Sequence, residues 1–441
     1  MFTTLKNAWR IPELKKKLLF TLFIIVLYRL GANILVPYVD PHIMNEASTL
    51  FSGNILQFLN MLSGGALAQA TLLALGVSPY ITSSIVMQLL TIAIPALERL
   101  SKEGEEGKKK ITAITRVVTV ALALITSIGY AMFLENNGFL VVDDANFFHY
   151  MVIVACYCAG AALVMWLAEK INESGIGNGI SMILFANIIA GTSSTLLALW
   201  QLIFPGNGTF QWWGIPVALV EIAIIIAIVM FIVWMTNAER RIPIQYAKRV
   251  VGRKMYGGQN THLPIKVNMS GVMPIIFSNS IVAIPATIVM LFDSDMSAGI
   301  SKFIDKFFNT TSWAYLVVFL VLLVAFAFFY IAISFNPVEV ANNIKNNGGA
   351  IPGIRSGRPT VEFIKKVLGR ITLIGALLIA VVAGFPMIVN NIAAMLGDAT
   401  TFAALAFGGS SMMIVVGVAL ETFRELEAQM SLRNYKGFLD D

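Results

Sequence analysis

The chain has 441 residues, of which 57% are hydrophobic and only 13% are charged. A water-soluble domain normally carries about 25% charged residues, so this composition excludes a soluble globular protein and indicates that the lipid bilayer is the solvent. The net charge of +6 alone would also fit a nucleic-acid-binding protein, and the placement of the charges has to decide between the two. Cys156 and Cys158 lie within one apolar run, so we expect neither a disulfide framework nor a metal site.

Apolar stretches long enough to cross a membrane recur along the whole chain. A helix needs about 20 apolar residues to span a hydrocarbon layer of about 30 Å. The first stretch contains Arg29 and ends at Pro37 without a cleavage pattern, so we interpret it as a retained helix and not a signal peptide. We predict an all-α polytopic membrane protein with ten transmembrane helices, at residues 18–36, 77–97, 111–134, 150–167, 180–204, 215–235, 272–291, 315–335, 371–389 and 402–420.

The positive charges lie on one side of these spans. Of the 31 Lys and Arg residues, 28 fall in the two termini and in alternate connections, whereas the opposite connections hold only Lys302 and Lys306. Cytoplasmic segments keep the excess of Lys and Arg, so both termini are predicted to be cytoplasmic. This asymmetry accounts for the net charge without nucleic acid.

Ten spans divide into two halves of five, and an odd number of spans places the halves in opposite membrane orientations, as in inverted-repeat channels and transporters. The segment at residues 54–70 is amphipathic and then rich in small residues, too short to cross the bilayer, so we expect it to be half-inserted from the outer side. The predicted organisation is a cytoplasmic amphipathic N-terminus at 1–17, a first half at 18–205, a second half at 206–420, and a cytoplasmic tail at 421–441.

The predicted membrane interior has almost no ionisable side chains. Arg29 and Glu221 are the clear candidates, and we interpret Glu221 as an interfacial or helix-packing residue instead of an ion-coupling carboxylate. Residues 174–179 (SGIGNG) resemble a phosphate-binding loop but lack the preceding strand and the lysine, so a tight turn is the better interpretation. We therefore expect no catalytic residues, no cofactor and no enzyme activity.

Two connections, at residues 236–269 and 336–370, are long and carry clustered basic residues. Loops of this length usually have a function, and basic clusters attract acidic surfaces, RNA or anionic lipid headgroups. In the second loop, Asn336-Pro337 precedes a short stretch with helical character and then a glycine pair. We predict that both loops form a docking surface for a cytosolic partner.

Several long motifs in one order resemble the SecY family, the channel-forming subunits of the bacterial Sec protein translocase, over nearly the whole chain. Ser356 departs from the family pattern, because many members have proline where this chain reads Gly-Ile-Arg-Ser-Gly. The matching motifs are MLSGGALAQATLLALGVSPYITSSIVMQLL (61–90), KEGEEGKKKI (102–111), ESGIGNGIS (173–181), RRIPIQYAKR (240–249), THLPIKVNMSGVMPIIF (261–277), FNPVEVANNIKNNGGAIPGIR (335–355) and FGGSS (407–411).

The resemblance implies an hourglass pore between the two halves, with a lateral gate between spans two and three on one side and seven and eight on the other. Branched apolar side chains around such a pore offer ions no replacement for their hydration shells. The resemblance places the pore ring at Val77, Ile81, Ile85, Leu184, Ile276 and Ile414. It places the plug at residues 54–70, including Asn54, Met61, Ser63, Gly64 and Gly65.

The resemblance also implies polar gate residues, whose interhelical hydrogen bonds we expect to bias the gate, and a docking surface. The polar gate residues are Gln88, Thr126, Ser278, Asn279 and Ser280, and the docking residues are Arg240, Arg241, Lys248, Arg249, Arg253, Lys254, Arg355 and Arg358. The partners implied are the SecE and SecG subunits, the SecA motor ATPase, the ribosome, a secretory polypeptide with its signal sequence, and membrane lipids.

The function expected is a passive channel in the bacterial plasma membrane, which moves unfolded secretory polypeptides across it and releases membrane segments sideways. The alternatives are a secondary transporter or a flippase of a small solute or lipid. A transporter predicts polar binding groups at mid-membrane, and a flippase a polar groove facing the lipid. An apolar constriction with large basic loops favours the channel.

Overall fold

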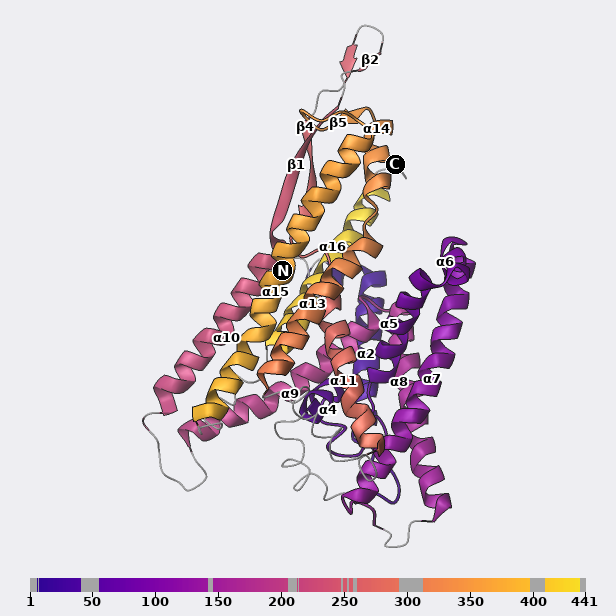
Figure 1. Cartoon of the computed structure of the whole chain (residues 1–441), viewed down its shortest axis with the longest axis vertical. Helices are drawn as coiled ribbons and strands as arrows, with labels where there is room; N and C mark the ends of the chain where they lie inside the picture. The colour runs from indigo at the N-terminus through magenta and orange to yellow at the C-terminus, as the bar shows by residue number, and fades with distance from the viewer. Residues whose placement is uncertain are drawn as a thin grey trace.

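The computed structural model describes residues 6, 8–40, 55–141, 146–204, 212, 214–246, 249–251, 254–256, 260–292, 312–396 and 409–436. Figure 1 shows long helices that run roughly together, with a small group of strands beyond one end of them. The main helices are α2 (Pro12–Gly31), α4 (Ile55–Ser63), α5 (Ser78–Ala93), α6 (Pro95–Lys102), α7 (Glu105–Asn136), α8 (Phe147–Ser174), α9 (Gly179–Ile203), α10 (Gly214–Asn237), α11 (Met273–Phe292), α13 (Trp313–Ser334), α14 (Pro337–Asn346), α15 (Arg358–Leu396) and α16 (Gly409–Lys436).

Several of these helices can cross a membrane. Within the described residues, five are long and apolar enough by themselves, and a sixth span results if the bent pair α5 and α6 is counted as one. Each of the ten predicted ranges overlaps a helix, but α9 and α11 contribute only shorter apolar segments. A multi-pass helical membrane protein is therefore confirmed, whereas the number of ten spans stays a prediction.

The second predicted span, at residues 77–97, ends earlier than expected. Helix α5 stops at Ala93, and α6 starts at Pro95 after a bend of 101°. Pro95 has no backbone N–H and its ring disfavours helical geometry at the residue before it, and Ile94 is accordingly extended, with φ −108° and ψ 113°. The Ile-Pro pair therefore turns the chain away from the span axis.

The two basic loops contain strands, so the prediction of an all-α fold was wrong at this end of the molecule. Strand β1 (Glu239–Tyr246) pairs antiparallel with β4 (Asn260–Lys266) and with β5 (Gly349–Ala350), and β2 (Arg249–Val251) pairs with β3 (Lys254–Tyr256). Along β1, the side chains of Ile242 and Ile244 are buried, and their neighbours are exposed. This alternation is typical of a half-buried strand.

Helices α14 and α15 support the sheet. Ile242 and Ile244 pack with Ile344 of α14 and Ile364 of α15 in one cluster. The predicted short helix after Asn336-Pro337 is confirmed as α14, with the Asn336 side chain accepting hydrogen bonds from two backbone N–H groups of its first turn. At 39 residues, α15 is about 58 Å long, roughly twice the hydrocarbon thickness, so its first turns carry the sheet beyond the apolar part of the molecule.

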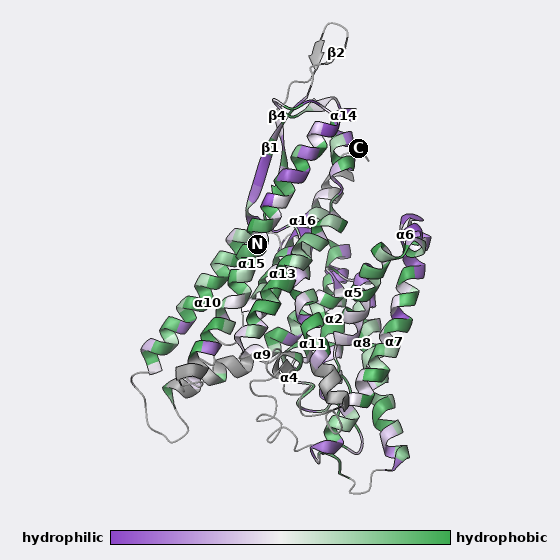
Figure 2. Cartoon of the chain, in the orientation of Figure 1, coloured by the Kyte–Doolittle hydropathy of each residue, from purple (hydrophilic) through white to green (hydrophobic). Residues whose placement is uncertain are grey.

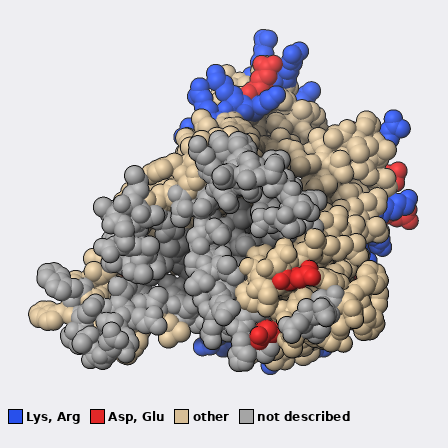
Figure 3. All heavy atoms as spheres, turned by 60° about the horizontal axis from the view of Figure 1, so that its bottom comes forward, with Lys and Arg blue, Asp and Glu red and all other residues tan. Residues whose placement is uncertain are grey.

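Hydropathy and charge divide the molecule along the same axis. Figure 2 shows mostly hydrophobic helices in the middle and hydrophilic colour on the sheet, on the sheet-side end of α15 and around α6. Figure 3 shows Lys and Arg gathered at the sheet end and only a few charges on the described surface that faces the viewer. This arrangement fits a membrane-embedded middle with a basic end that faces water.

The glycine-rich segment at 174–179 joins α8 to α9 in a tight turn, as predicted. Gly177 has φ +83°, a left-handed conformation that favours glycine. The Asn178 side chain accepts hydrogen bonds from the N–H groups of Ile180 and Ser181 and so caps α9. The turn therefore sets where α9 begins and how deep Leu184 lies along it.

An ion pair connects α7 to α8. Arg116 approaches Glu169 at 2.8 Å and also donates a hydrogen bond of 2.9 Å through Nε. The Glu169 side chain is only 10% exposed, whereas Glu173, which pairs with Lys170 at 2.6 Å, is 53% exposed. Removing the buried Glu169 carboxylate would leave Arg116 without its counterion and would cost stability. Removing the exposed Glu173 carboxylate would cost less, because exposed ion pairs contribute little to stability.

Replacing Glu169 is therefore expected to destabilise the helix bundle. We expect Glu169→Gln to reduce the free energy of unfolding by about 1–3 kcal/mol, and the matched variant Glu173→Gln to reduce it by less than about 1 kcal/mol. Unfolding of the purified protein by SDS titration measures both. Equal effects of the two variants would contradict a structural role for the Arg116–Glu169 pair.

Candidate functional site: an apolar constriction and a gate cavity

All six residues predicted for the pore ring lie in one hydrophobic cluster. They come from four elements that are distant in sequence: the start of α5, α9, α11 and α16. None is more than 5% exposed, and together they are Val77, Ile81, Ile85, Leu184, Ile276 and Ile414. The structure thus places the predicted set together in one buried cluster.

The spacing along α5 explains half of this set. Val77, Ile81 and Ile85 recur every four residues, so they form a row on one face of the helix. All three are buried, whereas Val86 and Gln88 of the same helix are exposed. A helix with this pattern can present one smooth apolar stripe to the centre of the bundle.

Helix α4 lies against the constriction. Leu62 of α4 belongs to the same hydrophobic cluster as the ring residues, and α4 contacts both α9 and α11. The hydroxyl of Ser411 in α16 donates a hydrogen bond to the sulfur of Met61, at 3.3 Å. Asn54, predicted as the start of the plug, lies outside the described residues, but the last turn of α4 packs against the cluster that holds the predicted ring residues.

The plug segment ends in a compact turn. Gly64 and Gly65 have φ +70° and +90°, and their N–H groups bond the carbonyl oxygens of Met61 and Asn60 at 3.0 and 2.8 Å. Left-handed glycines are the usual way to end a helix. The Ser63 hydroxyl, which is buried, accepts a hydrogen bond from the N–H of Leu67 at 3.0 Å. The predicted plug residues Met61, Ser63, Gly64 and Gly65 therefore lie at the end of a helix, whereas Asn54 is outside the described residues.

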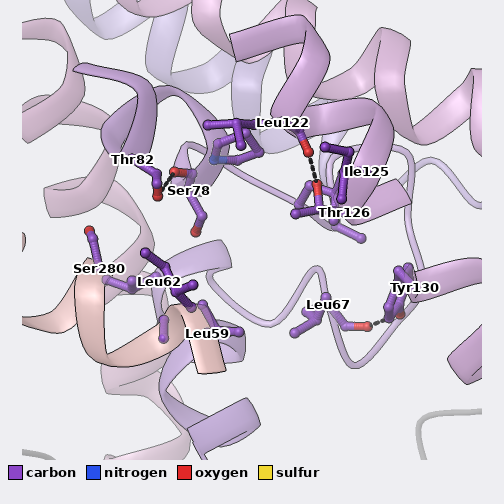
Figure 4. Close-up of a pocket in the computed structure, with 15 residues that line it drawn as sticks. Leu59, Leu62, Leu67, Ser78, Thr82, Leu122, Ile125, Thr126, Tyr130 and Ser280 are labelled. Atoms are coloured by element: carbon purple, nitrogen blue, oxygen red, sulfur yellow. Dashed lines mark hydrogen bonds between the residues drawn. The ribbon is translucent and has the colours of Figure 1, made fainter. Parts of the chain in front are cut away.

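A cavity of about 200 Å³ lies between this turn and three helices. Figure 4 shows Leu59, Leu62 and Leu67 on one side of it, and Ser78, Thr82, Leu122, Ile125, Thr126, Tyr130 and Ser280 around the rest. These residues come from the plug segment, α5, α7 and α11, and α11 packs against both α5 and α7. The cavity is thus a mainly apolar space at the boundary that the family resemblance predicts to be the lateral gate.

The predicted polar gate residues do not bridge the gate as expected. The hydroxyls of Thr126, Ser278 and Ser280 donate to carbonyl oxygens of their own helices, as is usual for Ser and Thr in apolar helices. Gln88 is exposed, and its amide lies 3.5 Å from Ser84 one turn away. Asn279 is buried and its side-chain amide has no hydrogen-bond partner among the described residues. Among the hydrogen bonds that the structure describes, none from these five residues joins two helices, so the expectation of interhelical bonds was wrong there.

Three side chains that the sequence did not single out as functional bond the predicted plug segment instead. Tyr130 of α7 and Tyr157 of α8 donate hydrogen bonds to the carbonyl oxygens of Leu67 and Ala70. Asn187 of α9 donates to the carbonyl oxygen of Leu62, at 2.6 Å, and to the hydroxyl of Tyr28, at 2.9 Å. The only signal in the sequence was indirect: Arg29, next to Tyr28, is a cation inside a predicted span.

The predicted docking residues lie on the sheet and on the turn before α15. Arg240 and Arg241 are exposed on β1, where Arg241 pairs with Glu239 at 2.7 Å. Arg355 is exposed, and Arg358 is exposed and pairs with Glu362 at 3.2 Å. Arg249 lies on β2 and Lys254 on β3, and Lys248 and Arg253 lie outside the described residues.

The turn around Arg355 is well supported despite Ser356. The buried Thr360 donates a hydrogen bond to the carbonyl oxygen of Arg355, at 2.8 Å, and Gly353 and Gly357 have φ +81° and +108°. On the neighbouring sheet, burial lowers the pKa of Lys266, and the nearby Arg424 lowers it further, while Glu239 raises it. The surface thus combines a fixed turn with a local excess of positive charge.

Comparison with known proteins agrees with this architecture. A model of the SecY family matches residues 71–423. The protein translocase subunit SecY of Streptomyces coelicolor is 44% identical over 450 residues, covering 100% of both chains.

Two solved structures share the fold. One, described as "The structure of a protein conducting channel", has a TM-score of 0.62 at 17% identity and covers 96% of each chain. Another, Sec61 in a canine ribosome-channel complex from the endoplasmic reticulum, has a TM-score of 0.58 at 15% identity, with the same coverage. The family match and the full-length identity show that the chain belongs to the SecY family.

Proposed function

We propose that this protein is a protein-conducting channel of the bacterial plasma membrane, through which unfolded secretory polypeptides cross the bilayer and membrane segments leave sideways into lipid. One observation carries the proposal. Six branched apolar residues from four elements converge in one buried cluster, and a short helix, α4, packs against that cluster. A constriction of this kind can close around a passing chain and excludes hydrated ions.

The gate cavity supports the lateral route. Its lining is mostly apolar and comes from α5 and α7 on one side and α11 on the other. An apolar signal sequence or membrane helix can replace the contacts between these helices at little cost, because its side chains resemble those that it displaces. In the proposed mechanism, α11 moves away from α5 and α7, the cavity widens towards lipid, and α4 leaves the ring.

The basic end of the molecule supports the proposed membrane orientation. The sheet, α6 and the first turns of α15 carry clustered cations, and positive loops remain on the cytoplasmic side. Both termini are then cytoplasmic, and the halves at 18–205 and 206–420 form the two walls of the pore. We propose that the exposed sheet and the turn at Arg355 bind the ribosome, which a relative of the same fold binds in its solved complex, and the SecA motor. SecE and SecG complete the assembly.

Reconstitution tests the function directly. The purified chain with SecE and SecG is placed in liposomes, and a secretory polypeptide is supplied with SecA and ATP. We expect protease-protected polypeptide to accumulate inside, and none without ATP. Saturable uptake of a single small solute by the chain alone, with no polypeptide transport, would instead support the secondary-transporter function; lipid scrambling without polypeptide transport would support a flippase.

Reversing one exposed charge on the docking surface tests partner binding. We expect Arg355→Glu to weaken binding of the ribosome or SecA at least tenfold at about 0.1 M salt, because the loss of attraction adds to new repulsion. Lys366→Glu, an equal charge change at another exposed position of α15, serves as the matched control and is expected to change binding less than threefold. Equal losses for the two variants would show only a general charge effect and contradict a specific docking site at Arg355.

A further inference from the structure

The described contacts of α4 show how the plug segment is held. Its last turn does not rest on apolar packing alone, because two side chains from outside the segment bond its terminal carbonyl oxygens. Arg29 of α2 donates to the carbonyl oxygen of Gly64 at 3.3 Å, and Asn187 of α9 donates to that of Leu62 at 2.6 Å. We call Tyr28, Arg29 and Asn187 the clasp.

The members of the clasp also fix one another. The guanidinium of Arg29 donates to the carbonyl oxygens of Ala186 and Asn187, at 2.9 and 3.3 Å, and the amide of Asn187 donates to the hydroxyl of Tyr28 at 2.9 Å. Tyr28 and Asn187 are fully buried, and Arg29 is half-buried. Among the described residues, no carboxylate forms an ion pair with Arg29.

The electrostatics explain why a cation is tolerated here. The last carbonyl oxygens of a helix carry a partial negative charge, and Arg29 bonds the carbonyl oxygen of Gly64, the residue directly after α4. A cation inside a predicted span is costly unless it finds such partners. Removing α4 from this place would therefore leave Arg29 and the amide of Asn187 with fewer acceptors, and water or another group has to replace them.

The position of the clasp suggests its role. Helix α4 has nine residues, too few for a helix to be stable alone, so contacts from its surroundings must hold it in place. The clasp comes from α2 and α9, both in the first predicted half, whereas the bond described between α4 and the second half is the weak contact of Ser411 with Met61. Movement of the second half can thus leave α4 in the ring until the clasp opens.

We infer that the clasp of Tyr28, Arg29 and Asn187 is the latch of the plug, and that breaking its bonds to Leu62 and Gly64 is a required step in opening the channel. This inference rests on the proposed channel function and adds the residues that control it. It assigns a positioning role to Arg29 and Asn187, since neither belongs to the cluster that holds the predicted ring residues. The bonds that Tyr130 and Tyr157 make to Leu67 and Ala70 form a separate anchor, about which α4 swings.

Two adjacent glycines provide a matched test. Both Gly64 and Gly65 have left-handed φ values, so alanine strains the backbone at either position. A Cβ at Gly64 would lie 2.8 Å from both terminal nitrogens of Arg29 and 2.9 Å from Asn187 Oδ1, whereas a Cβ at Gly65 meets nothing within 4 Å. Gly64→Ala therefore disturbs the clasp, and Gly65→Ala reproduces the backbone strain without that disturbance.

A second pair removes the polar group itself. Asn187→Leu keeps a similar side-chain size and removes both hydrogen bonds of the amide. Asn33→Leu serves as its control, because Asn33 is exposed and the bond described for its amide goes to the carbonyl oxygen of Arg29, one turn away in the same helix. The proposal can thus be tested even if one of the glycine variants fails to fold.

Two readouts separate the latch from the channel function. Hydrogen exchange of the full-length protein in nanodiscs reports whether residues 61–67 open locally, and chloride efflux from proteoliposomes reports leakage through the ring. For Gly64→Ala and Asn187→Leu, we expect hydrogen exchange at residues 61–67 and chloride efflux both to rise at least tenfold. For Gly65→Ala and Asn33→Leu, we expect both quantities to stay within threefold of the parent protein.

Two results would overturn the latch: equal effects of Gly64→Ala and Gly65→Ala, or unchanged exchange and efflux in Asn187→Leu. Increased exchange without increased efflux would also overturn it, because the segment would then be loosened without opening a path. Failure of the proposed function is seen separately, as a lack of polypeptide transport by the parent protein in the reconstituted assay.

Discussion

Linking residue 61 of α4 to residue 411 of α16 by a disulfide is expected to reduce polypeptide translocation at least tenfold. The Ser411 hydroxyl and the Met61 sulfur are 3.3 Å apart, so the ends of these two side chains meet. A cysteine sulfur lies one bond nearer to the backbone than a methionine sulfur, so the disulfide forms when α4 shifts towards α16 by about that difference. The bond would hold α4 against the ring, and a polypeptide cannot pass while the plug is there. The effect is large because the block is steric and does not depend on a small change in free energy.

The experiment needs a background without other thiols. Cys156 and Cys158 are both free, so Cys156→Ala and Cys158→Ala are introduced first. Translocation is then measured for Met61→Cys with Ser411→Cys after oxidation, with the cross-linked fraction read from a gel after cleavage between the two positions. Reductant is expected to restore transport, and Ser411→Cys alone serves as the control. Full transport by a fully cross-linked protein would show that α4 is not the plug.

Introducing polar groups into the constriction is expected to have the second large effect. We expect Ile276→Asn combined with Ile414→Asn to raise chloride efflux from proteoliposomes at least tenfold. Both side chains are buried in the ring cluster, at 5% and 0% exposure, and an amide there attracts water and offers ions partial replacement of their hydration shells.

The conservative variant Ile276→Val with Ile414→Val serves as its control, because it keeps the apolar character while slightly reducing the side-chain volume. We expect its efflux to stay within about twofold of the parent protein. Hydrogen exchange of both proteins checks that the bundle remains folded. The same efflux from the Asn and Val variants would mean that these two residues do not seal the pore.

Much of the fold could be predicted from apolar patterns within short stretches of the sequence. Apolar runs located a helix in each of the ten predicted ranges, whereas Val77, Ile81 and Ile85 were placed in the ring by the family resemblance and their spacing on one face of α5 agrees with it. The strand β1 was missed although Arg241, Ile242, Pro243 and Ile244 alternate between exposed and buried. Only two buried residues, Ile242 and Ile244, carry this alternation within a loop rich in cations, so the period of two is too short to indicate a strand by itself.

The ring and the clasp could not be predicted from the local sequence, because each depends on contacts between residues that are far apart in the chain. The predicted ring draws on α5, α9, α11 and α16, and the family resemblance alone placed Leu184, Ile276 and Ile414 in it. The clasp joins Arg29 to Gly64 and to the main chain of α9, 157 positions further along than Arg29. Nothing in the local sequence of Asn187 marks it as a hydrogen-bond donor to the plug, because an amide in an apolar helix has many possible partners.

The most direct test of the central claim is site-specific photo-crosslinking to a translocating chain. A photoreactive residue is placed in turn at Ile81, Ile276 and Ile414, and at Val120, which is 40% exposed on α7, as a control. A secretory polypeptide is then stalled during SecA- or ribosome-driven transport. We predict adducts with the polypeptide at the three ring positions and none at Val120. Adducts at Val120 alone, or none at any position despite confirmed engagement, would contradict the account of a polypeptide pore lined by these residues.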